Sequence, residues 1–444
     1  MLSPSADSHT SGAATGLEVR PFRALTYRQR DPEHLARVSS PAYDLVTPAG
    51  RDRLADADPY NIVRLILPRV DAPTGDRERA PGSVTVLRSA DQAAASLLAW
   101  EAEGILERDA APALWLYELR PPGPAAPTTG WLGAVALPSP ESAAVLPHED
   151  TYAPAVEGRR ALLAATRTDL EPIVLAHDPE PTVADVTRDA RRSEPTLEVQ
   201  DSDGVRHRLW RVTDPELLRS LSGALRRTGA VIADGHHRFA AATAHARTNP
   251  RTPGADAVLA LVTPMGAGGL RVDPIHRVIP EFGIEAAVAA ATHGFQATEL
   301  LPRSEPAAVT QTIQRWLDAD HESGFLVTDG SRLVQLTHPS PEVRATVPPE
   351  APDAWRRLDV VLAHHGLLGH LWGRADDPEA VLIAHSIGEA VSTALERAGV
   401  ALLLRAPSPG DVAAVARAGA RMPRKSTLFV PKPRTGLVLR PLAD

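Results

Sequence analysis

The chain has 444 residues, a formal net charge of −8 and no cysteine. The missing cysteine excludes disulfides, thiolate zinc sites and thiol catalysis, and the acidic balance gives no general attraction to nucleic acid or membranes. A chain of this length is expected to form two or three domains, each large enough for a hydrophobic core.

The stretch from Met1 to Gly16 is small and polar. We predict a disordered tail there, not a secretory signal, because the stretch has no apolar centre. Nowhere does the sequence approach the roughly 20 uninterrupted apolar residues that a membrane helix needs. We therefore expect a cytoplasmic protein.

Predicted strands and helices follow one another from Leu17 onward. Pro48 directly after Thr47 is typical of a helix start and predicts a helix over 48–57. The apolar run 62–67, ended by Pro68, predicts a buried strand, and 70–81 reads as a polar loop. The other strands predicted before residue 230 are 17–25, 113–119, 130–137 and 173–176, and the other helices are 89–103, 156–166 and 214–226.

Residues 231–241 form the most informative stretch of the sequence. A short apolar strand leads into Asp234-Gly235, and an alanine-rich helix begins with His236-His237-Arg238. Glycine permits a sharp turn, and the free amides and dipole of a helix start favour an anion. Arg238 can grip a phosphate with two hydrogen bonds, and Asp234 can hold a metal ion or accept a proton. The structural alternative is an ordinary strand–turn–helix corner that Asp234 caps.

The remaining sequence predicts a second set of elements after a boundary or hinge within 249–255. The predicted strands are 259–262, 270–274, 324–328 and 333–336, and the predicted helices are 239–247, 284–293, 307–319, 356–371, 387–398 and 411–420. Strands and helices do not alternate strictly, so we predict an α+β fold.

Motifs along 19–442 resemble the bacterial and archaeal family called domain of unknown function 1015. Ala42 departs from that family's Pro-Pro-Tyr-Asp element, and Ile275 departs from its Pro-Thr-His-Arg element. The matching stretches are Val19–Leu25, Pro41–Asp44, Pro59–Pro68, Pro147–Thr151 with Arg159 following on a helix, Asp234–Arg238, Pro274–Arg277, Met422–Thr427, Pro431-Lys432 and Thr435–Val438.

The corner at Asp234–Arg238 is also similar to the Gly-x-x-Arg phosphate site of the ParB/sulfiredoxin-like fold, which includes ParB and free-serine kinases. This resemblance implies a ParB/sulfiredoxin-like nucleotide-binding core over 17–248 and a C-terminal α+β domain over 256–444, whose last motif (422–438) returns to the cleft. It implies a bound nucleotide, ATP or ADP with CTP as an alternative, and phosphoryl transfer by analogy alone. Sulfiredoxin chemistry needs a cysteine, and the chain has none.

Two acidic motifs are candidates for the chemistry. Glu149 can act as general base toward a substrate hydroxyl, with His148 orienting it or binding phosphate. Asp44, next to Tyr43, can lie in the same cleft and hold Mg²⁺ together with Asp234. The structural alternative for both motifs is a turn or cap with solvated charges.

Basic and hydroxyl side chains elsewhere are candidates for contacts with phosphate or substrate. A solvated basic surface near the C-terminus and a structural histidine are the alternatives for them. The candidates for phosphate are Lys425, Ser426, Thr427 and Lys432, and those for the cleft are Arg159, His276 and Arg277.

We therefore predict a nucleotide-dependent phosphotransferase that acts on the hydroxyl of a small metabolite, with free serine as one candidate acceptor and Mg²⁺ as cofactor. Two alternatives stay open: a ParB-like nucleotide switch that binds DNA or protein, and a hydrolase or lyase acting on a phosphorylated small molecule. The acidic charge speaks against nucleic acid as a partner, and a homodimer is compatible with the sequence.

Overall fold

The computed structural model describes residues 16–69, 82–139, 141–266, 268–319, 323–374 and 380–443. The chain divides into two compact units. Unit 1 comprises residues 1–146, 151–269 and 431–444, and unit 2 comprises residues 147–150 and 270–430. The predicted loop at 70–81, and all of the predicted tail except Gly16, lie outside the described residues.

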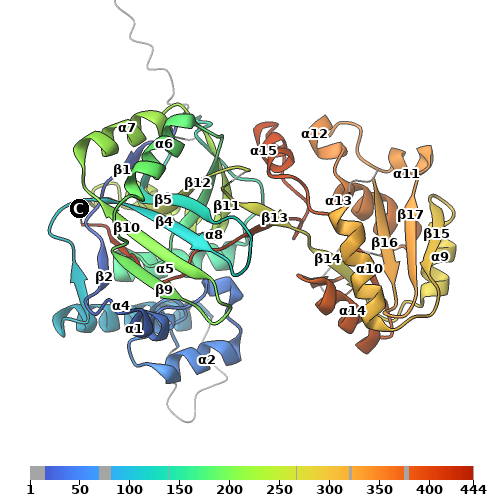
Figure 1. Cartoon of the computed structure of the whole chain (residues 1–444), viewed down its shortest axis with the longest axis horizontal. Helices are drawn as coiled ribbons and strands as arrows, with labels where there is room; N and C mark the ends of the chain where they lie inside the picture. The colour runs from blue at the N-terminus through green and yellow to red at the C-terminus, as the bar shows by residue number, and fades with distance from the viewer. Residues whose placement is uncertain are drawn as a thin grey trace, which may run out of the picture. The chain divides into compact units, whose positions relative to one another are not determined.

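Unit 1 is built on a nine-stranded mixed sheet (Figure 1). Most neighbouring strands are antiparallel, but β8 pairs in parallel with β12, and β6 with β11. In spatial order the strands are β6 (Val145–Leu146), β11 (Ala230–Asp234), β8 (Ile173–His177), β12 (Ala257–Pro264), β5 (Thr128–Ala136), β4 (Leu114–Arg120), β10 (Arg206–Val212) and β9 (Leu197–Gln200), with β1 (Val19–Arg20) paired to β5. Two short pairs accompany it: β2 (Leu25–Tyr27) with β3 (Leu106–Arg108), and β7 (Thr168–Asp169) with β21 (Arg440–Pro441).

Helices cover both faces of this sheet. Successive residues of a strand point to opposite faces, and in the central strands both sets of residues are apolar. Trp115 and Tyr117 of β4 lie in one core with α1 (Pro32–Val38) and α4 (Gly82–Ala102). Leu114 and Leu116 lie in a second core with α6 (Pro181–Ala190) and α7 (Pro215–Leu225). Figure 1 shows these two helix pairs on opposite sides of the sheet. The other helices of unit 1 are α2 (Pro48–Ala57), α3 (Val63–Ile66), α5 (Ala153–Thr166) and α8 (His236–Thr248), with a 3-10 turn at Tyr43–Leu45.

One predicted element has the wrong type. The apolar run 62–67 is predicted as a strand, but it contains the helix α3. The side-chain oxygen of Asn61 accepts a hydrogen bond from Val63 N at 2.9 Å, and its amide donates to Arg37 O at 2.6 Å. These bonds start a helical turn, and the run is still buried as expected. Periodicity alone cannot separate a buried strand from a buried helical turn in so short a run.

The strand predicted over 17–25 is also divided. It becomes β1 and the start of β2, with Pro21 directly after β1. Proline has no backbone N–H to donate, so it interrupts the pairing of the strand with its neighbours.

Unit 2 contains a six-stranded sheet in which all neighbours are antiparallel. Its strands in order are β15 (Gln296–Leu301), β17 (Leu333–Thr337), β16 (Gly324–Thr328), β19 (Val400–Leu403), β14 (His276–Ile279) and β18 (Leu382–Ala384). The core joins this sheet to α10 (Pro306–Asp318) and α14 (Ile387–Glu396). The remaining elements are α9 (Ile284–Ala291), α11 (Pro341–Ala345), α12 (Asp353–Arg356), α13 (Asp359–Leu362), a π-helix (Ala363–Leu371), α15 (Pro409–Arg417) and the strand pair β13 (Arg271–Asp273) and β20 (Leu428–Val430).

The predicted α+β class is confirmed, but the predicted domain boundary is not. The sequence places a boundary within 249–255, whereas β12 follows at once and pairs with β5 and β8 inside the sheet of unit 1. Unit 1 therefore continues to Gly269. The last motif is split as well, since 422–430 belongs to unit 2 and 431–438 to unit 1. Within the described residues, no helix combines the length and apolarity that crossing a bilayer requires.

Candidate phosphate-binding site

The Asp234-Gly235 corner joins β11 to α8, as the sequence predicts. Gly235 has a φ angle of 92°, a left-handed conformation that glycine adopts without strain. A Cβ atom at this position would lie 2.8 Å from Cγ2 of Ile173. The glycine therefore permits both the turn and the close contact with β8.

The first turn of α8 has no side-chain cap. The bond from Phe239 N to Gly235 O, 2.9 Å long, is the first of the helical type, so the amides before it have no acceptor within the helix. His237 Nε2 accepts a hydrogen bond from Tyr152 N at 3.1 Å, and the side chain of His236 is buried. Together with the helix dipole, these amides favour an anion at the start of α8.

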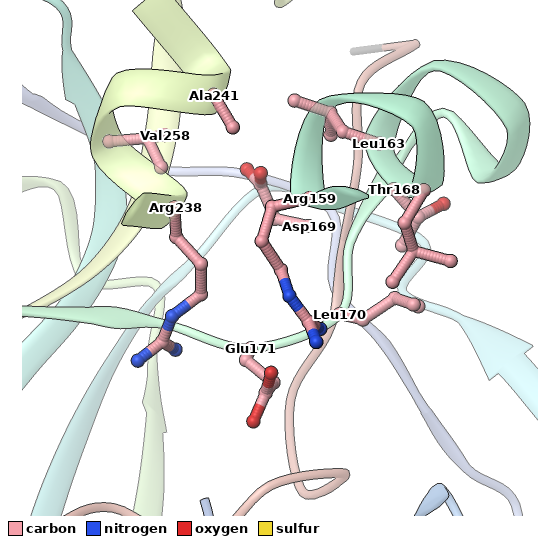
Figure 2. A pocket seen from close by; sticks show the side chains of 10 residues that line it. Arg159, Leu163, Thr168, Asp169, Leu170, Glu171, Arg238, Ala241 and Val258 are labelled. Carbon is pink, nitrogen blue, oxygen red and sulfur yellow. The ribbon is translucent and has the colours of Figure 1, made fainter. Parts of the chain in front are cut away.

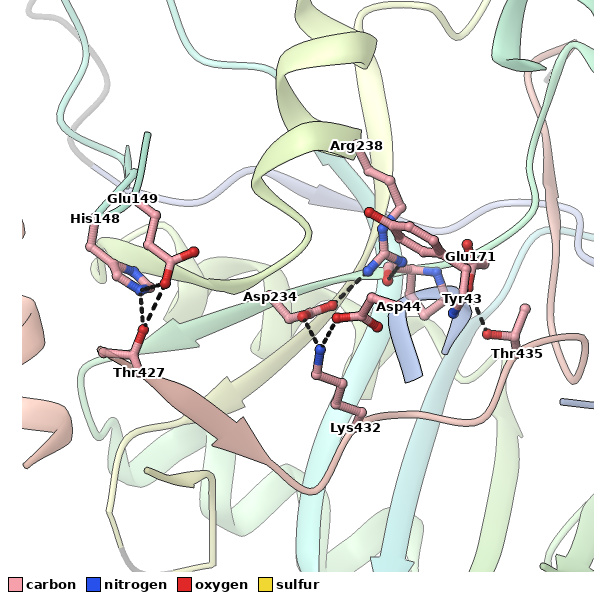
Figure 3. Close-up of polar contacts among 11 residues, drawn as sticks. Tyr43, Asp44, His148, Glu149, Glu171, Asp234, Arg238, Thr427, Lys432 and Thr435 are labelled. Carbon is pink, nitrogen blue, oxygen red and sulfur yellow. Dashed lines mark hydrogen bonds and ion pairs between the residues drawn. The ribbon is translucent and has the colours of Figure 1, made fainter. Parts of the chain in front are cut away.

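Asp234 lies between two cations (Figure 3). Its Oδ2 atom accepts a hydrogen bond from Arg238 Nη2 at 2.5 Å, and its Oδ1 atom lies 2.6 Å from Lys432 Nζ. Lys432 also contacts the carboxylate of Asp44, and Arg238 Nη1 donates to Pro172 O at 2.5 Å. We call Asp44, Asp234, Arg238 and Lys432 the Asp234 cluster. Asp234 thus acts as a counter-ion of the neighbouring cations and does not cap the helix.

The charges of this cluster stabilise one another. Burial raises the pKa of Asp234, but the charges of Arg238 and Lys432 outweigh it and hold the pKa below the ordinary value. Burial lowers the pKa of Lys432, but Asp234 and Asp44 outweigh it and the pKa is raised. Asp234, Arg238 and Lys432 are therefore charged at neutral pH, although less than one sixth of each of these three side chains is exposed.

Tyr43 lies beside two arginines next to this cluster. The guanidinium carbon of Arg159 is 4.0 Å from the centre of the Tyr43 ring, and that of Arg238 is 5.5 Å from it. Glu171 Oε1 accepts hydrogen bonds from Tyr43 N at 3.0 Å and from Thr435 Oγ1 at 2.9 Å. The structure therefore brings Tyr43, predicted as a cleft residue, into contact with Arg159 and with the predicted phosphate ligand Arg238.

A small cavity of about 40 Å³ opens beside Arg238. Figure 2 shows the side chains of Arg159 and Arg238 extending toward Glu171 from two helices. The Nε atom of Arg238 is buried and has no hydrogen-bond partner among the described residues. The cavity has room for a water molecule but is far below the roughly 300 Å³ of a typical ligand pocket. A nucleotide would therefore have to bind outside it, over the start of α8.

The residues around Asp234 do not form a resident Mg²⁺ site. Proteins commonly hold Mg²⁺ through one or two carboxylates together with phosphates and water, and Asp44 and Asp234 are two such carboxylates. The ammonium group of Lys432 already contacts both of them, and Arg238 holds the second oxygen of Asp234. Among the described residues, no group of three or more His, Asp or Glu side chains could hold a metal ion. The role of metal ligand predicted for Asp234 therefore finds no support in this arrangement.

The last segment of unit 1 holds Lys432 in place. Arg434 is buried, and its side chain donates to Ser39 Oγ at 2.6 Å and to Ala36 O at 3.0 Å. Its backbone N donates to the Tyr117 hydroxyl at 2.9 Å. Because these bonds anchor the chain two residues beyond Lys432, the ammonium group reaches Asp234 from a fixed backbone.

His148 and Glu149 belong to unit 2 and meet Thr427 there (Figure 3). Thr427 Oγ1 donates to Glu149 Oε1 at 3.0 Å and lies 3.0 Å from His148 Nε2. A carboxylate only accepts and a hydroxyl has one proton, so His148 Nε2 donates to Thr427. His148 also packs on Phe429, with ring centres 5.7 Å apart. Thr427 thus links the two residues, and the catalytic roles of His148 and Glu149 stay predictions.

The other predicted site residues of unit 2 differ in exposure. Lys425 is exposed, and Ser426 is buried with its hydroxyl donating to Pro423 O at 2.6 Å. His276 and Arg277 are 1 % and 0 % exposed. His276 Nδ1 accepts a hydrogen bond from Leu404 N at 3.3 Å, and Arg277 donates to Arg424 O at 3.1 Å. Neither side chain reaches the surface of unit 2, so burial does not support the predicted role of His276 and Arg277 in lining a cleft.

Sequence reasoning missed Glu171 and Thr435 as members of the site. Their mutual contact, and the contact of Glu171 with Tyr43, join segments that are far apart in the chain. Thr435 lies inside the last predicted motif, which was the only available signal. Glu171 has no local pattern that could have singled it out.

The chain belongs to the family described as "Protein of unknown function (DUF1015)", whose model matches residues 19–361. The motif at 422–438 lies beyond this match. No curated protein matches the chain.

Three solved structures illustrate what the fold is similar to. A point mutant of a free serine kinase in complex with ADP is 12% identical, with a TM-score of 0.32, and the match covers 70% of this chain and 90% of that one. SbnI with a C-terminal truncation from Staphylococcus aureus is 13% identical, with a TM-score of 0.35 and coverage of 70% and 88%. A conserved hypothetical protein from Pyrococcus furiosus is 12% identical, with a TM-score of 0.29 and coverage of 65% and 87%. Likenesses at this level assign no activity to the chain.

Proposed function

We propose that the chain is a nucleotide-dependent phosphotransferase that transfers a phosphoryl group to the hydroxyl of a small metabolite, with free serine as the first acceptor to test. The observation that supports this proposal is the uncapped start of α8, flanked by the two buried cations Arg238 and Lys432. Helix amides and paired basic side chains are the groups that proteins use to hold polyphosphates.

In this proposal the phosphates of ATP or ADP lie over the start of α8. Their oxygens accept hydrogen bonds from backbone amides of the first turn and compete with Asp234 for Arg238 and Lys432. Arg238 keeps its position during this exchange because Pro172 O holds its other terminal nitrogen. A di- or triphosphate is favoured over a singly charged anion, since only several negative charges can replace the carboxylates that already neutralise the cations.

The contribution of these residues to transfer is electrostatic. Arg238, Lys432 and the helix amides orient the nucleotide and stabilise the negative charge on the phosphoryl oxygens. Pro172 O holds Arg238 while the nucleotide displaces Asp234, so the guanidinium group needs little reorganisation. No step is assigned to Mg²⁺, because Lys432 already contacts both of the carboxylates that would hold it.

The full chain, incubated with ATP or ADP labelled at the terminal phosphate and a pool of hydroxy amino acids, tests this proposal. The expected result is a labelled phosphoester, identified by mass spectrometry, that is lost in Arg238→Gln and retained in Arg247→Gln. Arg247 is an exposed arginine at the far end of the same helix and is the matched control. Release of label as free phosphate would favour the hydrolase alternative, and nucleotide binding without turnover would favour the switch. Either result contradicts the proposal.

A further inference from the structure

Unit 2 contains a pocket of about 580 Å³ that is separate from all residues discussed above. Its walls come from Ser323 just before β16, from α11 and the residues that follow it, and from the segment 353–362 that contains α12 and α13. Its volume falls within the roughly 300–1,000 Å³ of known small-molecule sites. The pocket is therefore of a size that can take up an organic ligand.

Arginines on the rim give this pocket a positive character. Arg356 has Asp353 at 3.5 Å, one helical turn away. Arg344 and Arg357 also line the pocket, and among the residues that the structure describes neither has a carboxylate within ion-pair distance. Two guanidinium groups with free donor edges thus face the same space.

Asp359 also lines the pocket, and among the described residues no ion pair joins it to these arginines. Burial raises the pKa of Asp359, although Ser323, the charge of Arg405 and Gly324 N act to lower it. None of the three arginines that line the pocket is among the charges that act on Asp359.

The remaining wall is apolar. Val347, Leu358 and Leu362 line the pocket and are buried, with 5 %, 6 % and 8 % of their surfaces exposed. An apolar wall beside convergent charged groups is the usual composition of a small-molecule site. The wall offers a surface for the hydrocarbon part of a ligand.

We propose that this pocket binds a small organic anion, a phosphate or carboxylate group carried on an apolar body. Arg344 and Arg357 hold the oxyanion, for which the planar guanidinium provides paired donors. The apolar body lies on Val347, Leu358 and Leu362. This site is independent of the nucleotide site proposed for unit 1.

Calorimetric titration of the full chain with three probes tests the inference. The probes are phenyl phosphate, benzoate and uncharged benzyl alcohol, and every chain carries Arg238→Gln so that binding at α8 is weakened throughout. We expect one or both anions to bind and benzyl alcohol not to bind. Arg344→Gln and Arg357→Gln should each weaken anion binding by about tenfold or more, as the loss of a charge-assisted hydrogen bond predicts. Arg303→Gln, which changes an exposed arginine of the same unit outside the pocket, should leave it unchanged.

The two anions separate the two headgroups, and tighter binding of either one supports the proposal and identifies the headgroup. Equal affinity of the Arg344→Gln, Arg357→Gln and parent chains overturns it, as does equally tight binding of benzyl alcohol. A folded chain that binds neither anion at millimolar concentration also overturns it. Circular dichroism establishes folding, which should be preserved because both arginines are exposed.

Discussion

The carboxylate of Asp234 lies 2.6 Å from the ammonium nitrogen of Lys432, a residue from the last segment of the chain. The same carboxylate holds Arg238 at 2.5 Å. One acidic side chain thus neutralises two cations beside the start of α8, which has no side-chain cap, and an incoming phosphate must compete with it. This competition distinguishes our proposal from a site in which Asp234 binds the ligand through a metal.

Asp234→Asn should strengthen the binding of pyrophosphate by about tenfold, because it removes the internal competitor for Arg238 and Lys432. The same change should lower the free energy of unfolding, because two buried cations lose their partner. Isothermal titration and urea unfolding measure the two effects. Asp256→Asn removes an exposed ion pair with Arg20 and is the control, for which little change is expected. Weaker binding of pyrophosphate by Asp234→Asn would instead make Asp234 a contributor to binding.

Gly235→Ala should lower the free energy of unfolding by about 1–3 kcal/mol, the usual cost of a strained backbone position. The alanine would keep a positive φ angle, which is unfavourable for any residue with a side chain. Its Cβ atom would lie 2.8 Å from Ile173 Cγ2. Gly223→Ala is the matched control in the helix α7, where no atom lies within 4 Å of the new Cβ. It should raise stability by about 1 kcal/mol, as alanine does inside a helix. Equal urea midpoints for the two variants would contradict the role given to Gly235.

Glu149→Gln tests the predicted general base. If Glu149 removes the proton of the acceptor hydroxyl, turnover should fall by about 100-fold or more while the affinity for ADP stays unchanged. The control is Glu396→Gln, which changes an exposed glutamate at the end of α14. Unchanged turnover in Glu149→Gln would show that Glu149 is not the general base and would leave it only the structural contact with Thr427.

His276 should make unit 2 sensitive to acid. Burial, together with the charge of Arg277, lowers the pKa of His276 to about 4. In the unfolded chain the value is roughly 6.5, so between these values the unfolded state binds more protons and stability falls as pH falls. The loss amounts to about 3 kcal/mol on going from pH 7 to pH 4. His276→Asn retains an acceptor for Leu404 N and should lose less stability over this range, measured by urea unfolding. The same pH dependence in both chains would contradict the assignment.

Local signals in the sequence predict most elements of the fold. The helix 48–57 is predicted with its correct bounds because Thr47 accepts a hydrogen bond from Gly50 N and Pro48 stands at the first turn. The run 62–67 is predicted as a strand instead of a helix, because the side-chain hydrogen bond of Asn61 decides between the two. The domain boundary fails for a different reason, since the pairing of β12 with β5 and β8 depends on residues far away in the chain.

The candidate site likewise contains features that the local sequence predicts and features that depend on distant parts of the chain. The Asp234-Gly235 turn and Arg238 are visible locally, because glycine and the residues of the helix start act within one turn. The contacts of Lys432 with Asp44 and Asp234 depend on how the last segment returns to unit 1, and the bond of Glu171 to Tyr43 has no local pattern. The burial of His276 and Arg277 likewise follows from packing within unit 2.

Equilibrium binding of ADP to the full chain, to Arg238→Gln and to Arg247→Gln tests the central claim most directly. The account predicts that Arg238→Gln weakens binding by about tenfold or more, as expected for the loss of a charge-assisted contact with phosphate, and that Arg247→Gln binds like the parent chain. Wild-type affinity in a folded Arg238→Gln chain would show that the start of α8 does not hold the nucleotide.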